Sequence, residues 1–160
     1  MGLDPLTAQL IEFVRSAGIA VRTCPLDDTT FLPGLDIQSG TLLIDAARLA
    51  YPGDILHEAG HIAVADAERR MQPVLKPTKA EEMAAMAWSY AAIRHLNLPP
   101  DIVFHGHGYQ QGNRALIEAY RQGTGPGLPM LIWFGVTACP HGRQPGDASQ
   151  PFPRMDRWLR

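Results

Sequence analysis

The chain has 160 residues, of which 46% are hydrophobic and 19% charged, and its formal net charge is -2. This length fits one domain, and this composition is typical of a folded globular protein. The small negative charge argues against nucleic acid as a partner, because binding to phosphates needs a basic surface. No stretch reaches the roughly 20 apolar residues of a membrane span. The N-terminal residues also lack the features of a signal peptide, so we expect a cytoplasmic protein without a membrane partner.

The first third of the chain predicts a helix followed by short strands. Asp4-Pro5 is a favourable helix start, apolar residues then recur at helical spacing, and Gly18 ends the helix. Residues 19–24 have the pattern of a strand. Residues 31–37 and 41–45 are two further strand candidates, and the glycine-containing turn between them predicts a hairpin.

Two longer helices are expected in the middle of the chain. The first, 54–69, follows a Pro-Gly break and ends in two arginines. The second, 79–96, begins with the capping box Thr78-x-x-Glu81 and is rich in alanine, which favours helix and permits close helix packing.

The remainder of the chain is less regular. A His- and Gly-rich loop is expected at 101–112 and a short helix at 113–122, whereas 130–139 is a buried segment of either strand or helix. Proline and glycine dominate from residue 140 onward. We therefore expect one domain, 1–139, and a C-terminal tail, 140–160, that is loosely ordered over 140–153.

The helix at 54–69 contains His57-Glu58-Ala59-Gly60-His61, an H-E-x-x-H pattern. Residues four apart share one face of a helix, so His57 and His61 can bind one metal ion, with zinc preferred. Glu58 lies beside them and can take a proton from a water at that ion, which makes it the candidate catalytic base.

A catalytic zinc site of this kind needs a third protein ligand. Val64 and Ala67 stand where the longer H-E-x-x-H-x-x-G-x-x-H pattern requires Gly and His, so that class is excluded. A glutamate from the helix at 79–96 is the alternative. Glu81 is already assigned to the capping box, whereas Glu82 faces another direction.

Small residues support Glu82 further. Ala85 and Ser89 share its helical face and would let this helix lie close to the H-E-x-x-H helix. We predict Glu82 as the third ligand, and the alternatives that stay open are Glu81, His105 and His107.

A peptidase also needs a donor for the negative charge that develops on the carbonyl oxygen. His107 and Tyr109, in the loop at 101–112, are our predicted catalytic donors, and His105 and Tyr90 are the alternatives. Tyr90 and Trp88 lie on the alanine-rich helix, where a place in the core is the simpler expectation.

Residues 34–93 resemble the metallopeptidase domain of the ImmA/IrrE family, a group of bacterial gluzincin-like zinc proteins. The resemblance rests on the strand TLLID, on the segment LHEAGHIAV, and on a later helix in which Glu82 is followed by Ala85 and Trp88. It implies a zincin-like domain that binds zinc through His57, His61 and Glu82, with Glu58 as the catalytic base. The chain is too short to add the DNA-binding or sensor domain that members of this family often carry, so we expect a divergent, stand-alone domain.

These features predict an α+β fold. We expect a small, mostly antiparallel sheet packed against the H-E-x-x-H helix and the glutamate-bearing helix, with a cleft between the edge strand and the first of these helices. The predicted function is that of a zinc-dependent metallopeptidase acting on a peptide or protein substrate. The alternative is a zinc-binding interaction module of the same fold without proteolytic activity.

Overall fold

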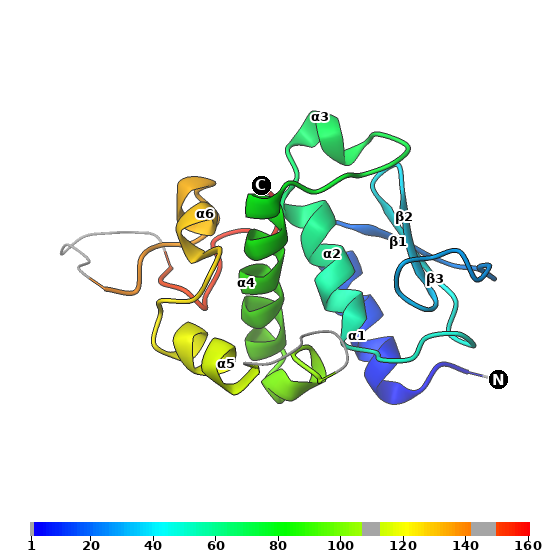
Figure 1. The fold of residues 1–160 in the computed structure, drawn as a ribbon, viewed down its shortest axis with the longest axis horizontal. Coiled ribbons are helices and arrows are strands. Elements are labelled where there is room, and N and C mark those ends of the chain that lie inside the picture. Colours follow the sequence, from blue (N-terminus) through cyan, green and yellow to red (C-terminus); the bar gives the residue numbers. More distant parts are fainter. Residues whose placement is uncertain (1, 107–112, 142–149) are drawn as a thin grey trace.

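The structure is a computed structural model that describes residues 2–106, 113–141 and 150–160. A small sheet lies at one side of the molecule, α2 and α4 run side by side through the middle, and α5 and α6 lie beyond α4 (Figure 1). Helices and a separate small sheet share one hydrophobic core, which confirms the α+β class.

The N-terminal half begins as the local signals predict. Helix α1 (Pro5–Ser16) starts at Asp4, whose side chain accepts a hydrogen bond from the Thr7 backbone N–H at 3.0 Å. Three strands follow, namely β1 (Ala20–Thr23), β2 (Leu35–Gln38) and β3 (Thr41–Ile44). β2 and β3 form the predicted hairpin, whose two turn residues, Ser39 and Gly40, both have positive φ.

The sheet has the strand order β1-β3-β2, so β2 is an edge strand. β1 pairs with β3 in parallel and β2 pairs with β3 in antiparallel fashion. The prediction of a mostly antiparallel sheet is therefore wrong, because one of the two strand pairs is parallel. The chain leaves β1, crosses to the outer edge as β2, and returns through the hairpin to the centre, so β3 runs in the direction of β1.

The predicted strand at 31–37 is also shorter in the structure. Leu32 and Leu35 form an isolated bridge around a tight turn at Pro33-Gly34, where Gly34 has a φ of 77°. The strand therefore begins only at Leu35, and Phe31 lies in a loop.

Helix α2 (Asp54–Val64) carries the H-E-x-x-H residues and ends before the predicted position 69. Ala65 is extended, and the Asp66 side chain accepts a hydrogen bond from the Arg69 N–H at 2.9 Å, which starts the separate short helix α3 (Ala67–Arg70). An aspartate that caps a new helix competes with continuation of the old one.

Helix α4 (Lys79–His95) begins with the predicted capping box at Thr78. It packs against α2 at Gly60, where an added Cβ would lie 2.9 Å from the Ala85 carbonyl oxygen and 3.2 Å from the Ala85 Cα. The glycine of the motif and the alanine of α4 thus permit the close helix packing that the small residues predicted. Trp88 and Tyr90 are buried in the core, as expected.

The chain continues through the 3-10 helix η1 (Pro100–Ile102), α5 (Asn113–Arg121) and α6 (Leu128–Trp133). The segment 130–139, for which strand and helix were both open, therefore begins as helix. Among the described residues, no helix combines the length and apolar character needed to cross a membrane.

The expectation of a separate tail is wrong for its last part, residues 150–160. Phe152 is buried, and the ring of Trp158 packs edge-on against Phe13 at 4.9 Å and against Trp88 at 5.5 Å. The Arg160 N–H also donates to the Ala63 carbonyl at 3.0 Å. These aromatic contacts with α1 and α4 make the segment part of the domain.

Candidate metal centre

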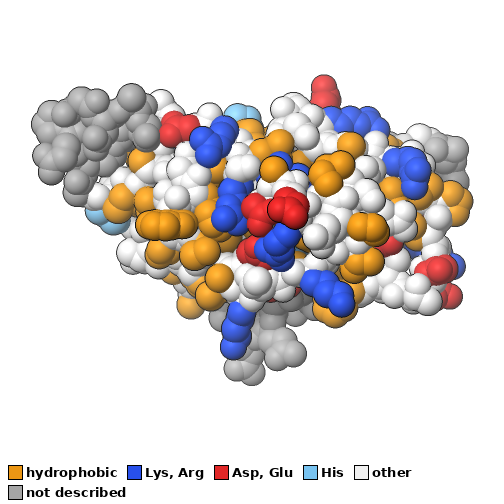
Figure 2. All heavy atoms as spheres, turned by 90° about the horizontal axis from the view of Figure 1, so that it is seen from above, with side chains coloured by type: hydrophobic (Ala, Val, Ile, Leu, Met, Phe, Trp, Pro, Cys, Tyr) orange, Lys and Arg blue, Asp and Glu red, His pale blue; other side chains and the backbone are white. Residues whose placement is uncertain are grey.

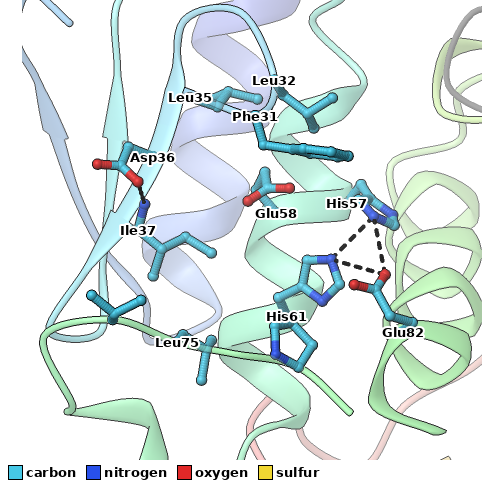
Figure 3. A pocket seen from close by; sticks show the side chains of 12 residues that line it. Phe31, Leu32, Leu35, Asp36, Ile37, His57, Glu58, His61, Leu75 and Glu82 are labelled. Atoms are coloured by element: carbon cyan, nitrogen blue, oxygen red, sulfur yellow. Dashed lines mark hydrogen bonds and ion pairs between the residues drawn. The ribbon is translucent and has the colours of Figure 1, made fainter. Parts of the chain in front are cut away.

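Three predicted ligands converge between α2 and α4 (Figure 3). The Nε2 atoms of His57 and His61 are 3.1 Å apart, and Glu82 Oε2 lies 3.4 Å from His61 Nε2 and 4.0 Å from His57 Nε2. These three ligand atoms all lie within 4.8 Å of one another, so the group could hold a metal ion. The structure thus brings together the three residues that the sequence singled out.

The spacing of these atoms suits a zinc ion. Ligand atoms at about 2.0–2.1 Å from a tetrahedral zinc ion are about 3.3 Å from one another. The triangle of 3.1, 3.4 and 4.0 Å scatters around that value. Two imidazoles and one carboxylate also match the donor types of catalytic zinc sites, so the residues present fit zinc.

The two histidines are held in the form that binds metal. Burial lowers the pKa of His57 to about 4 and that of His61 to about 3, and the charge of His57 depresses the latter further. Both rings are therefore neutral at pH 7, as metal ligation requires. Within the described residues, the buried Nδ1 of His61 has no hydrogen-bond partner, so the polar contacts of this ring are those of Nε2 with His57 and Glu82.

Glu81 is directed elsewhere. Its Oε2 accepts a hydrogen bond from the Thr78 backbone N–H at 2.8 Å, and its carboxylate forms an ion pair with Arg69. The capping box therefore determines which of the two neighbouring glutamates reaches the histidines. Glu82 is left to project toward α2, with its side chain half exposed.

The chain was also compared with known proteins. No family model, curated protein or solved structure matches it. The resemblance to the ImmA/IrrE family therefore stays a prediction, and the candidate metal centre rests on the geometry of its own residues.

Glu58, the predicted base, lines the same cleft as the three ligands. Burial raises the pKa of its carboxyl group to about 7, and the negative charges of Glu82, Asp54 and Asp36 add to this effect. A carboxyl group with a pKa near neutrality can both accept and return a proton at pH 7.

The cleft has a volume of about 330 Å³ and lies where it was predicted, between the edge strand β2 and α2. One wall comes from β2 and the loop before it, the opposite wall comes from the α3–α4 connection, and the ligands and Glu58 form the floor. The wall residues are Phe31, Leu32, Leu35, Asp36 and Ile37 on one side and Val74, Leu75 and Pro77 on the other.

The structure places two of the four candidates for the oxyanion donor, Tyr90 and His105. His107 and Tyr109 lie outside the described residues. Tyr90 is buried against the rings of Tyr120 and Phe152 and is absent from the lining of the cleft, so it is not a donor there.

His105, the remaining candidate, lies beside the first turn of α2. Its Nε2 is 2.6 Å from Asp54 Oδ1, and its ring stacks on Tyr51 at 4.1 Å. Burial raises the pKa of Asp54, and the hydrogen bond to His105 opposes this shift in part. Sequence reasoning missed this pair, although Asp54 precedes His57 by one helical turn and so shares its face.

Proposed function

We propose that the chain is a zinc-dependent metallopeptidase. The observation that carries this proposal is the convergence of His57, His61 and Glu82 beside a carboxyl group, Glu58, whose pKa is near neutrality. A metal site needs the first three residues, but a hydrolase also needs the fourth, in a cleft that a substrate can enter.

The chemistry follows from the positions of these side chains. A zinc ion held by the three ligands supplies a Lewis acid that polarises a carbonyl group and lowers the pKa of water. Glu58 accepts the proton that the attacking water loses as its oxygen bonds to the carbonyl carbon. Glu58 then returns this proton to the amine nitrogen as the carbon–nitrogen bond breaks.

The edge strand provides a means of aligning the substrate. Gln38 and Thr41 flank the two-residue turn and pair with each other, so the backbone groups of Ile37 point away from β3 toward the open edge. The Ile37 N–H donates to the Asp36 side chain, which leaves the Ile37 carbonyl as the acceptor for a substrate N–H. An extended peptide can add to this edge through backbone hydrogen bonds. Such a peptide would cross the cleft above Glu58 and the ligands.

The decisive experiment compares wild type with Glu58→Gln, both loaded with zinc, in the digestion of a mixed peptide library analysed by mass spectrometry. We expect Glu58→Gln to keep one zinc per chain and to lose about 10²–10⁴-fold in hydrolysis rate, the usual contribution of general base catalysis. Glu12→Gln, an exposed glutamate on α1, is the matched control and should behave as wild type.

Two results would contradict the proposal in different ways. Hydrolysis that survives in Glu58→Gln would exclude the role of Glu58. A wild-type chain that holds one zinc and cleaves no peptide would instead favour the zinc-binding interaction module.

A further inference from the structure

Two exposed apolar side chains stand at the cleft. Phe31 is 97% exposed and Val74 is 64% exposed, and both line the cavity above the candidate metal centre. Figure 3 shows the ring of Phe31 beside Glu58 and His57. Burial of an apolar side chain is favourable because its surface leaves water, so the complex gains stability when a ligand covers either of these residues.

The cleft continues this apolar character on both sides. Leu32, Leu35 and Ile37 extend the wall that holds Phe31, and Leu75 and Pro77 extend the wall that holds Val74. By contrast, on the face that carries α3, apolar side chains are interspersed with Lys, Arg, Asp and Glu (Figure 2). Apolar walls over a polar floor are typical of a pocket that binds a side chain and orients the atoms below it.

The charges of the cleft narrow the choice of side chain. Asp36, Glu58 and Glu82 line it, and neither Lys nor Arg is among its described lining residues. Even with the charge of a zinc ion at the centre, these carboxyl groups leave no excess positive charge in the cleft, so an acidic substrate residue finds no Lys or Arg partner among the described lining residues. The Asp36 carboxylate already accepts a hydrogen bond from the Ile37 N–H at 2.8 Å, and the carboxyl groups of Glu58 and Glu82 lie at the metal centre. The apolar walls are therefore the part of the cleft that can distinguish one substrate side chain from another.

We infer that the cleft selects peptides with a large apolar side chain next to the cleaved bond, and that Phe31 and Val74 determine this selectivity. This inference rests on the proposed peptidase function. The two residues close on the substrate side chain from opposite walls, while the backbone of the peptide follows the edge of β2. Removal of either apolar surface weakens the preference for a large side chain and leaves the metal ligands in place.

The test uses a peptide that the zinc-loaded chain cleaves, with the residue on each side of the cleaved bond changed in turn to Leu, Ala and Asp. We expect kcat/KM for Leu to exceed that for Ala by about 10- to 100-fold at one of the two positions, with Asp lowest, because each buried methylene group is worth about fourfold and Leu has three more carbon atoms than Ala. Phe31→Ala and Val74→Ala should each reduce the Leu-to-Ala ratio by about fivefold to tenfold.

Trp133→Ala is the matched control. Trp133 is also a highly exposed aromatic residue, at 82%, but it lies on α6 and is absent from the lining of the cleft. The control should keep the wild-type ratio, and zinc content should be equal in all variants. A Leu-to-Ala ratio that is the same in wild type, Phe31→Ala and Val74→Ala would overturn the inference while leaving the peptidase function intact.

A chain that cleaves nothing would overturn the proposed function instead, and the selectivity would then be read from binding. The probes are the blocked peptides acetyl-Gly-Gly-X-Gly-Gly-amide, with X as Leu, Ala or Asp, titrated into the zinc-loaded chain by calorimetry. Preferential binding of the Leu peptide that weakens in Phe31→Ala supports the selectivity. Equal binding of the three peptides, or no binding, contradicts it.

Discussion

Replacement of Glu82 by Gln tests the metal centre most directly. The side chain of Glu82 is 50% exposed, so the fold tolerates the change, but among the described residues its carboxylate is the one acidic group within 4.0 Å of both histidine Nε2 atoms. Structural sites with four ligands bind zinc with a free energy of about 10–16 kcal/mol, so one ligand contributes about 3 kcal/mol to zinc binding. We therefore expect Glu82→Gln to raise the dissociation constant of zinc about 100-fold.

Glu81→Gln is the matched variant, because the neighbouring glutamate has a different task. Its side chain is only 7% exposed and links the Thr78 N–H to Arg69 at the start of α4. We expect this change to leave zinc affinity unchanged and to lower the free energy of unfolding by about 1–2 kcal/mol through loss of the cap. Zinc per chain after gel filtration, competition with a chromophoric chelator, and urea unfolding measure both effects. Zinc loss in Glu81→Gln with retention in Glu82→Gln would refute the assignment of the ligand.

Two further predictions follow from the packing and charge of α2. Gly60→Ala places a Cβ 2.9 Å from the Ala85 carbonyl oxygen, so α4 must shift, and we expect a loss of about 1–3 kcal/mol in unfolding free energy together with weaker zinc binding. Unchanged stability and unchanged zinc affinity in this variant would contradict the close packing of α2 and α4. The folded-state pKa of Glu58 is about 7 against an ordinary value of 4.5, so the unfolded chain releases this proton first and the metal-free protein loses stability as the pH rises from 4.5 to 7. Relative to Glu58→Gln, the unfolding free energy of the wild type should fall by about 3 kcal/mol over this pH range, measured by urea unfolding with a chelator present. If the unfolding free energies of the two proteins changed with pH in parallel, the raised pKa of Glu58 would be excluded.

Several features of the fold were predictable because their causes are local. The Asp4 cap, the capping box at Thr78 and the turn at Ser39-Gly40 each depend on residues within one turn of backbone, and each is found where the sequence placed it. The end of α2 was predicted wrongly, although Asp66 marks it. An aspartate inside a helical pattern is ambiguous, since it can cap a new helix or remain on the exposed face of the old one.

Other features depend on contacts between distant segments, and local patterns say little about them. The parallel pairing of β1 with β3 depends on the path of the connection between β1 and β2. The packing of Trp158 against Phe13 joins the two ends of the described chain, and the proline-rich composition before it pointed to a tail instead. The pair of Asp54 and His105 was missed for the same reason, because 51 residues separate its members.

The position of Glu82, the predicted third ligand, shows how a long-range contact becomes predictable when local constraints eliminate the alternatives. The capping box engages Glu81, and the next residue on an α-helix points about 100° away, so Glu82 is free to reach a neighbouring element. That element can be α2 only if the two helices approach closely, and Gly60 lies within the H-E-x-x-H motif at the point where Ala85 would otherwise meet a side chain. One glycine therefore sets the distance between the helices, and this distance allows a carboxylate from α4 to reach two imidazoles on α2. The packing of two small residues and the geometry of the candidate metal centre are consequences of the same approach.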